Sequence, residues 1–127
     1  MATRKDRLKK LVEVQEQLKA LHQTRRAGFL AEAAAAEREA QELAEHFDAE
    51  GSLAVLFPEL YHNRIAGAFR RREESLENAR AEAGRVAAAT ARTNMVERAY
   101  KAERADDERQ RGDRERLDII EQARRKD

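Results

Sequence analysis

The stretch GSLAVLFPELY (residues 51–61) is an apolar cluster in a chain whose residues are 40% charged, and it contains the chain's one proline. Gly51 suits the left-handed backbone conformation that often ends a helix. Ser52 is a candidate N-cap for a short helical turn over Leu53–Leu56. Pro58 disfavours helix at the residue before it and suits the first turn of a new helix. The stretch is therefore predicted to be a corner at which the chain reverses.

The composition on either side of this corner predicts long helices. Ala, Glu, Arg, Lys and Leu dominate the 127 residues, and aromatic residues make up 5%. This is the composition of coiled coils rather than of a compact globule. We expect one all-α domain spanning 1–127, a long antiparallel two-helix coiled-coil hairpin with a helix over 4–50, a corner over 51–58 and a helix over 58–125.

The first half has a heptad-like apolar pattern. Seam-type residues recur in steps of three and four and continue to Phe47, a spacing typical of the a and d positions of a coiled coil. At Phe29 two steps of four follow each other, which predicts a stutter that locally unwinds a supercoil. The predicted seam residues are Leu8, Leu11, Gln15, Leu18, His22, Arg25, Phe29, Ala33, Ala36, Ala40, Leu43 and Phe47.

The second half repeats the pattern after the corner. Its steps again alternate between four and three, and the apolar character decays after Glu97. The predicted seam residues are Ile65, Phe69, Arg72, Leu76, Ala79, Ala83, Val86, Thr90 and Thr93.

Charge supports a specific register. Folding about residue 54 places residue i opposite roughly residue 108 − i, so that Arg70–Arg72 face the acidic region 37–45. The same register places Glu82 opposite Arg25 and Arg26. Exposed ion pairs contribute under about 1 kcal/mol each, so they select the register rather than hold the helices together.

The sequence offers no catalytic constellation and no cofactor motif. It has no cysteine, no Gly-rich phosphate loop and no zinc signature. His46 and His62 are close to the corner, where a metal site or a pair of solvated polar side chains is conceivable, and ligand spacing favours the solvated pair. His22 falls on the seam, where a polar residue sets the register of a coiled coil.

The remaining features bound the partners and the location. The net charge is +1, and no aromatic stacking pattern accompanies the basic tracts, so nucleic-acid binding is not expected. The chain shows neither a secretory signal nor an apolar run of the roughly 20 residues that cross a bilayer. A cytoplasmic protein is therefore expected, and membrane association only through partners. The apolar corner exceeds what one partner helix covers, which predicts a protein-binding surface.

The segment LYHNRIAGAFRRREESL (Leu60–Leu76) carries a resemblance to a known family. The chain resembles the flagellar export protein FliJ and its YscO-like relatives in type III secretion, which are small, highly charged antiparallel coiled coils. In that family the second helix begins with an aromatic or aliphatic residue, then an aliphatic residue, a small residue and a long polar side chain. Tyr61, Ile65, Ala68 and Arg72 match this order, although Arg72 departs from the family's neutral or histidine type.

The resemblance implies two partners and no enzymatic activity. The chain would be a stalk or escort protein of a flagellar or injectisome export apparatus, linking a hexameric export ATPase to a membrane export gate at the inner face of the cell membrane, and escorting export chaperones. The implied gate-binding residues are Phe57, Tyr61, Ile65, Ala68, Phe69 and Arg72. The implied ATPase-binding residues are Arg4, Lys5, Arg7, Lys9, Lys10, Arg104 and Arg111.

The residues themselves leave other functions open. A coiled coil of this kind also serves as a structural spacer, often as a homodimer, or as a prefoldin-like chaperone or adaptor of another system. An enzyme or a nucleic-acid binder is a third class, for which the sequence offers little.

Overall fold

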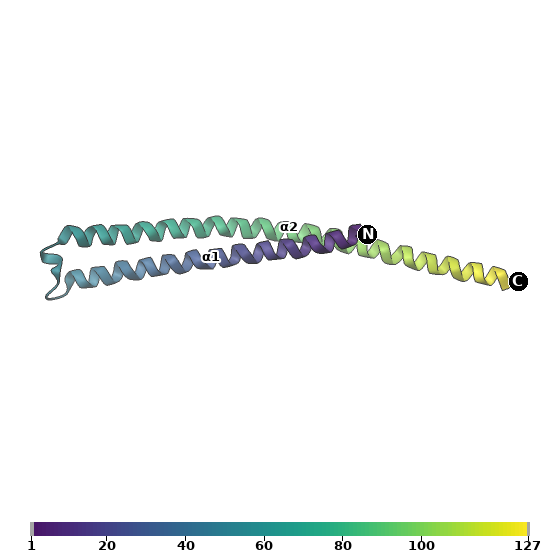
Figure 1. The fold of residues 1–127 in the computed structure, drawn as a ribbon, viewed down its shortest axis with the longest axis horizontal. Helices are drawn as coiled ribbons and strands as arrows, with labels where there is room; N and C mark the ends of the chain where they lie inside the picture. Colours follow the sequence, from purple (N-terminus) through teal and green to yellow (C-terminus); the bar gives the residue numbers. More distant parts are fainter. Residues whose placement is uncertain (1, 127) are drawn as a thin grey trace. The chain divides into compact units, whose positions relative to one another are not determined.

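The computed structural model describes residues 2–126, and it consists of two long helices joined by a short corner (Figure 1). Helix α1 spans Arg4–Asp48, the 3-10 helix η1 spans Leu53–Val55, and helix α2 spans Pro58–Lys126. No strand occurs among the described residues. The predicted all-α helical hairpin is confirmed. Met1 and Asp127, the ends of the predicted domain, lie outside the described residues.

The chain forms two compact units, each built from a piece of both helices. The hairpin unit contains residues 19–88, and the terminal unit contains residues 2–18 and 89–126. Within each unit α1 and α2 run side by side in opposite directions (Figure 1). In the terminal unit, ion pairs between the helices reach as far as Asp107. Beyond Asp107, α2 continues to Lys126, and every described residue there except Gly112 is exposed.

Helix α1 begins with a reciprocal cap. The Asp6 backbone N–H donates to Thr3 Oγ1 at 3.2 Å, and the Thr3 N–H donates to the Asp6 carboxylate at 3.2 Å. These two bonds satisfy donors that a helix start otherwise leaves free. The hydrogen bonds from the Thr3 backbone and hydroxyl groups also hold the pKa of Asp6 below its usual value. The T-x-x-D spacing is the sequence signal for this cap.

The corner has the local structure that its sequence predicts. Gly51 has a φ of 75°, which side chains with a Cβ adopt only with strain. The Ser52 hydroxyl accepts a hydrogen bond from the Ala54 N–H at 3.0 Å and caps η1, and Pro58 is the first residue of α2. Helix α1 ends at Asp48 rather than at the predicted Glu50, because the Ser52 N–H bonds to the Ala49 carbonyl in a turn.

The seam of α1 differs from the prediction in its first half. Val12 and Lys19 are half-buried, whereas Leu11 and Leu18 are exposed. The half-buried and buried positions therefore follow alternating steps of four and three, except that Arg26, which falls on this pattern, is exposed, and the predicted stutter at Phe29 is wrong. The seam residues of α1 are Lys5, Leu8, Val12, Gln15, Lys19, His22, Phe29, Ala33, Ala36, Ala40, Leu43 and Phe47.

About half of the predicted seam positions of α2 are confirmed. Ile65, Arg72, Ala79, Val86 and Thr93 lie on it, and the positions between them are one residue earlier than expected. Small or polar side chains occupy those positions, whereas Phe69 is exposed and Leu76, Ala83 and Thr90 lie beside the seam. The corrected positions are Ala68, Ser75, Glu82 and Ala89.

Small side chains occupy the most buried positions of the two seams. Every buried apolar residue among the described residues is an alanine, and no large side chain there is fully buried. Alanine lets two helix backbones approach closely, since interaxial distance depends on the side chains at the contact. A seam predicted from the bulkiest apolar residues is therefore displaced by one residue from the buried position at several steps. Buried seam alanines are Ala33, Ala36, Ala40, Ala68, Ala79 and Ala89.

Ion pairs across the hairpin unit agree with the charge-based register. Arg71 lies 2.7 Å from Glu39, and Arg72 lies 4.0 Å from Glu37, as expected for the 70–72 tract. The Arg71–Glu39 pair is largely exposed and the Arg72–Glu37 pair is long, so each contributes little to stability.

Gly51 and Gly84 are predicted to respond oppositely to the same substitution. Both have open space where a Cβ would lie, but only Gly51 has positive φ. Gly51→Ala should lower the free energy of unfolding by about 1–2 kcal/mol through left-handed strain. Gly84→Ala, in the interior of α2, should raise it by about 1 kcal/mol. Urea unfolding followed by circular dichroism measures both, and equal effects would contradict the assigned corner geometry.

Candidate functional site

The corner is held by its own backbone hydrogen bonds and by an aromatic cluster behind it. The N–H groups of Leu56 and Phe57 both donate to the Leu53 carbonyl at 3.0 Å. On the inner side, the ring of Phe47 lies 6.1 Å from that of Tyr61, edge to face. The Phe47 ring also lies 5.2 Å from the His62 ring. The corner is thus a defined structure, and its inward side is already covered.

The outward side of the corner is an exposed apolar surface. Ala54 points inward and is buried, while its bulky neighbours face outward. Exposure ranges from 49% for Leu60 to 87% for Val55. We name these residues the corner surface: Leu53, Val55, Leu56, Phe57 and Leu60.

Part of the corner surface is hollowed. An open depression of about 550 Å³ is lined by Leu56, Phe57, Pro58, Glu59, Leu60 and Asn63. Four of its six lining residues are apolar, and the carboxylate of Glu59 and the amide of Asn63 also line it. A depression of this kind accepts an apolar side chain from another protein more readily than it holds a reacting group.

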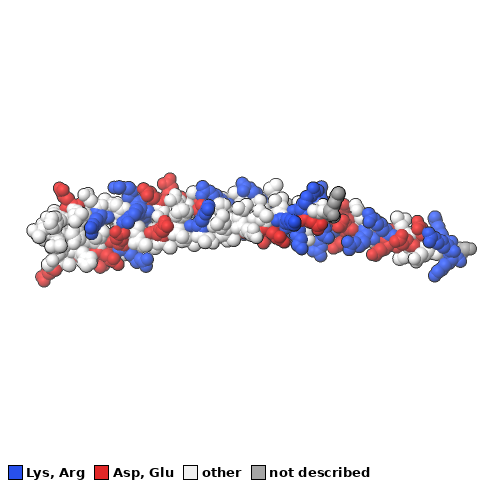
Figure 2. Space-filling model, viewed as in Figure 1, with Lys and Arg blue, Asp and Glu red and all other residues white. Residues whose placement is uncertain are grey.

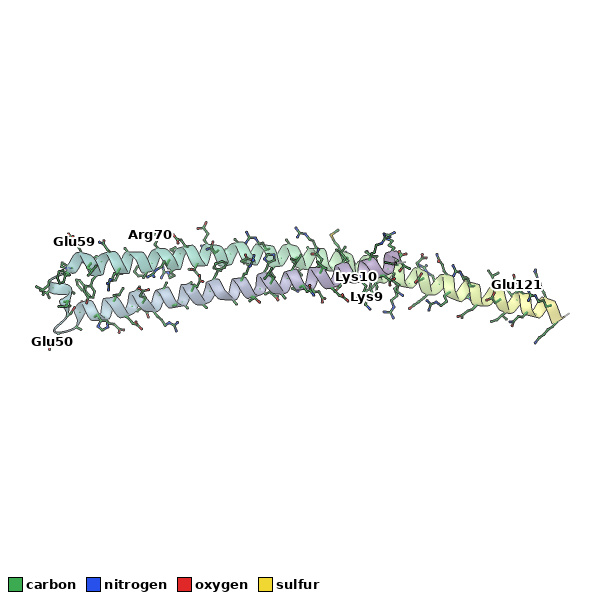
Figure 3. All side chains as sticks on the ribbon, viewed as in Figure 1. Lys9, Lys10, Glu50, Glu59, Arg70 and Glu121 are labelled. Atoms are coloured by element: carbon green, nitrogen blue, oxygen red, sulfur yellow. The ribbon has the colours of Figure 1, made fainter. Side chains whose placement is uncertain are left out.

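Acidic residues border the corner surface. Glu45, Asp48, Glu50 and Glu59 are all exposed and lie within a few residues of it in sequence. Figure 2 shows this end of the hairpin unit as mostly uncharged surface with acidic side chains at its edges, and Figure 3 labels Glu50 and Glu59 there. The surface therefore presents an apolar centre with a negative border.

The predicted gate-binding residues have different environments. Phe57 and Phe69 are exposed and accessible to a partner. Tyr61 and Ile65 are half-buried on the seam and contribute to helix pairing. Ala68 has 0% exposure, so it contacts α1 and presents no surface to a partner.

Arg72, the sixth predicted gate residue, is also engaged within the chain. Its guanidinium lies 3.0 Å from the Glu73 carboxylate and 5.0 Å from the centre of the Phe69 ring. This cation–π contact covers part of Phe69. The residues that the family resemblance implies as a binding face therefore lie mainly on the seam, and the accessible apolar residues lie in the corner stretch before it.

Sequence reasoning identified the corner stretch as unusual but did not select Leu53, Val55, Leu56 and Leu60 as binding residues. The signal was available in the stretch itself. A run of bulky residues interrupted by proline has no helical periodicity, so a single partner helix cannot bury all of it.

The predicted ATPase-binding residues lie in the terminal unit and form only weak ion pairs. Arg4 lies 3.9 Å from Glu103, Lys5 lies 3.8 Å from Asp107, and Arg104 lies 3.4 Å from Glu108. The other four are exposed, and within residues 2–126 none of them has a carboxylate within 4.0 Å: Arg7, Lys9, Lys10 and Arg111.

A buried polar group lies on the seam of the hairpin unit. The Glu82 carboxylate, in a residue only 2% exposed, lies 2.7 Å from His22 Nδ1 and accepts a bond from Arg85 at 2.6 Å. The predicted partners of Glu82, Arg25 and Arg26, are exposed instead. The charge-based register places these arginines opposite Glu82, but the residue of α1 that faces Glu82 across the seam is His22. His22 keeps its expected polar seam position.

The environment of Glu82 determines its charge. Burial favours the neutral acid and acts to raise the pKa, but the hydrogen bonds from His22 and Arg85 outweigh burial and hold the pKa of Glu82 below its usual value. An ionised carboxylate only accepts hydrogen bonds, so His22 Nδ1 is the donor. Breaking such a buried pair costs more than forming it gains, which makes it a register-setting contact.

Glu82→Gln is predicted to weaken the acid sensitivity of the fold. A carboxyl group whose pKa is depressed on folding stabilises the native state above its unfolded pKa, and that stability is lost as pH falls through the folded pKa. The wild-type urea midpoint should therefore fall as pH drops below about 4.5, the usual value for Glu. The Glu82→Gln midpoint should fall less over the same range. Parallel curves for the two proteins would contradict the role of Glu82.

Comparisons with known proteins assign no family to this chain. No protein-family model, no curated protein and no solved structure matches the chain. Within the described residues, no helix is long and apolar enough to cross a membrane. Among residues 2–126, no three His, Asp or Glu side chains are grouped to hold a metal ion, His46 and His62 included.

Proposed function

We propose that the chain is a non-enzymatic stalk or escort protein of a type III export apparatus, flagellar or injectisome, that links a hexameric export ATPase to a membrane export gate. Its site of action would be the inner face of the cell membrane. The observation that carries the proposal is the corner surface, an exposed apolar cluster at the end of a charged two-helix hairpin. The family resemblance supplies the identity of the partners.

The corner surface is suited to protein binding on energetic grounds. Fully burying a Val, Leu or Phe side chain is favourable by about 1.5–3 kcal/mol. Five such side chains at one end offset a large part of the cost of association, estimated at about 4–15 kcal/mol. The acidic border favours a gate surface whose apolar pocket is surrounded by Lys or Arg, because charge complementarity speeds encounter and rejects wrong partners.

The terminal unit is suited to a different kind of contact. Apart from the half-buried Lys5, its described Lys and Arg side chains are exposed, and the ion pairs between its two helices are long and weak. Contacts made through such groups are screened by salt and exchange rapidly. An ATPase ring that turns over needs a contact of this kind, which seats the stalk without fixing it permanently.

Removing the apolar character of the corner is predicted to abolish gate binding selectively. Leu56→Ser with Phe57→Ser should weaken binding to the purified cytoplasmic domain of the gate by about a hundredfold, as expected for buried anchors. Binding to the export ATPase should be unchanged. Leu117→Ser with Ile120→Ser, an equally exposed pair on α2, is the matched control.

Unchanged gate binding in the corner variant, or no binding by the wild type, would contradict the proposal. Circular dichroism verifies that both variants retain their helices. Sedimentation at increasing concentration distinguishes the spacer or adaptor function. A stable dimer lost in the corner variant, together with no gate binding, would favour that alternative.

A further inference from the structure

The two sides of the helix pair in the terminal unit differ sharply in charge. Each residue of a helix is rotated by about 100° from the last, so residues just before seam positions lie on one side and residues just after them on the other. In an antiparallel pair, the residues just before the seam positions of both helices lie on the same side of the pair, which we call the preceding side. The residues just after the seam positions of both helices lie on the other side, the following side. In the hairpin unit one groove confirms this, since its walls combine Glu32 and Glu39 of α1 with Arg71 and Asn78 of α2, all of which precede seam residues.

The following side of the terminal unit is a mixed-charge surface. A depression of about 360 Å³ there is lined by Lys9, Val12, Glu13, Glu97, Tyr100 and Lys101. The carboxylates of α1 in this unit, Asp6, Glu13 and Glu16, all follow seam residues. They therefore lie on this side, which leaves the opposite side of α1 without negative charge.

The preceding side is apolar and basic. Leu11, Val14 and Leu18 of α1 are exposed there, as is Met95 of α2, which is 67% exposed. Up to Glu103, which is itself on the seam, no carboxylate of either helix lies on this side. Basic side chains occur along and beside it, and within residues 2–126 none of the following four has a carboxylate within 4.0 Å: Arg7, Lys10, Arg92 and Arg98. Figure 3 labels Lys10.

The exposed apolar side chains of the two helices lie near one another on this side. The register of the Arg4–Glu103 ion pair places Met95 of α2 at the level of Leu11 and Val14 of α1. An exposed apolar stripe of this kind accepts the apolar stripe of another helix. Met95 is flexible and adapts to the packing of a third helix.

We propose that this basic–apolar face of the terminal unit docks an amphipathic helix whose apolar stripe is flanked by Asp and Glu. Charge complementarity selects this occupant. A second copy bound through the same face would oppose like charges in a two-fold contact. A lipid surface favours a broad apolar side rich in Trp, Phe and Leu, and this face has two leucines and neither Trp nor Phe. The inference stands independently of the proposed function, because its test uses no export component.

The test uses a synthetic helix as the probe. A fluorescent peptide of about 21 residues has Leu at its a and d positions and Glu at e and g, and a matched peptide has Lys in place of Glu. Fluorescence anisotropy at about 50 mM salt, where charge screening is weak, measures binding to the full chain. The Glu peptide should bind at least about tenfold more tightly than the Lys peptide, and added salt should weaken it.

Two matched pairs of variants locate the binding face. Leu11→Gln with Leu18→Gln should weaken binding of the Glu peptide by about tenfold or more, whereas Leu117→Gln with Ile120→Gln, elsewhere in the same unit, should not. Arg7→Glu with Arg98→Glu should also weaken binding of the Glu peptide. Lys9→Glu with Lys101→Glu makes the same charge change on the opposite side of the unit and should leave this binding unchanged. Circular dichroism confirms that each variant keeps its helices.

Several results would overturn the proposal. They are no binding of the Glu peptide, equal binding of both peptides, or equal loss in the control variants. Competition for the face by vesicles of phosphatidylserine and phosphatidylcholine would assign it to a lipid surface instead. A dimer detected by sedimentation and lost in Leu11→Gln with Leu18→Gln would assign it to a second copy.

Discussion

The fold depends on one geometric constraint: in each unit two helices share a single interface, so each helix buries only one narrow stripe. Close approach of the backbones then matters more than the size of the buried side chains, and alanines occupy the most buried positions, such as Ala40 and Ala68. Bulky apolar residues that fall outside this stripe have no interior to enter. They remain at the surface, where the corner and one side of the terminal unit collect them, and these are the surfaces at which partners are proposed to bind.

The same constraint gives Glu82 its importance. A seam whose buried apolar residues are all alanines does little to fix its register through side-chain shape, because a shift by one helical turn still places small side chains against small ones. A carboxylate that is buried on the seam and satisfied by His22 and Arg85 has suitable partners in one register only. Ion pairs such as Arg71 with Glu39 favour the same register from the surface, with less force because water screens them. Polar groups thus fix the register of one helix along the other, and small side chains set how closely the two helices approach.

Local sequence signals predicted the elements well and the seam less well. Glycine, serine and proline act on their own backbone, so Gly51, Ser52 and Pro58 located the corner without knowledge of the rest of the chain. The phase of the seam is a property of two helices together. Leu11 and Phe69 have more apolar surface than the adjacent Val12 and Ala68, yet the latter face the partner helix, because bulk at every step would hold the backbones apart. Four of the six gate-binding residues that the family resemblance implies also lie on the seam rather than on an accessible surface, and Ala68 is the clearest example.

The sequence by itself determined that the chain forms two long helices, that it reverses after Gly51, and that charge pairs residues 70–72 with the acidic segment of the first helix, since these follow from backbone preference, periodicity and charge order. Only the tertiary structure decided which stripe of each helix is buried. That choice turned Glu82 towards His22, left Leu53 to Leu60 mostly facing solvent, and separated the carboxylates of the amino-terminal segment from its leucines. The physical reason is that a helix presents several stripes of similar hydrophobicity, and the fit of a second helix selects among them.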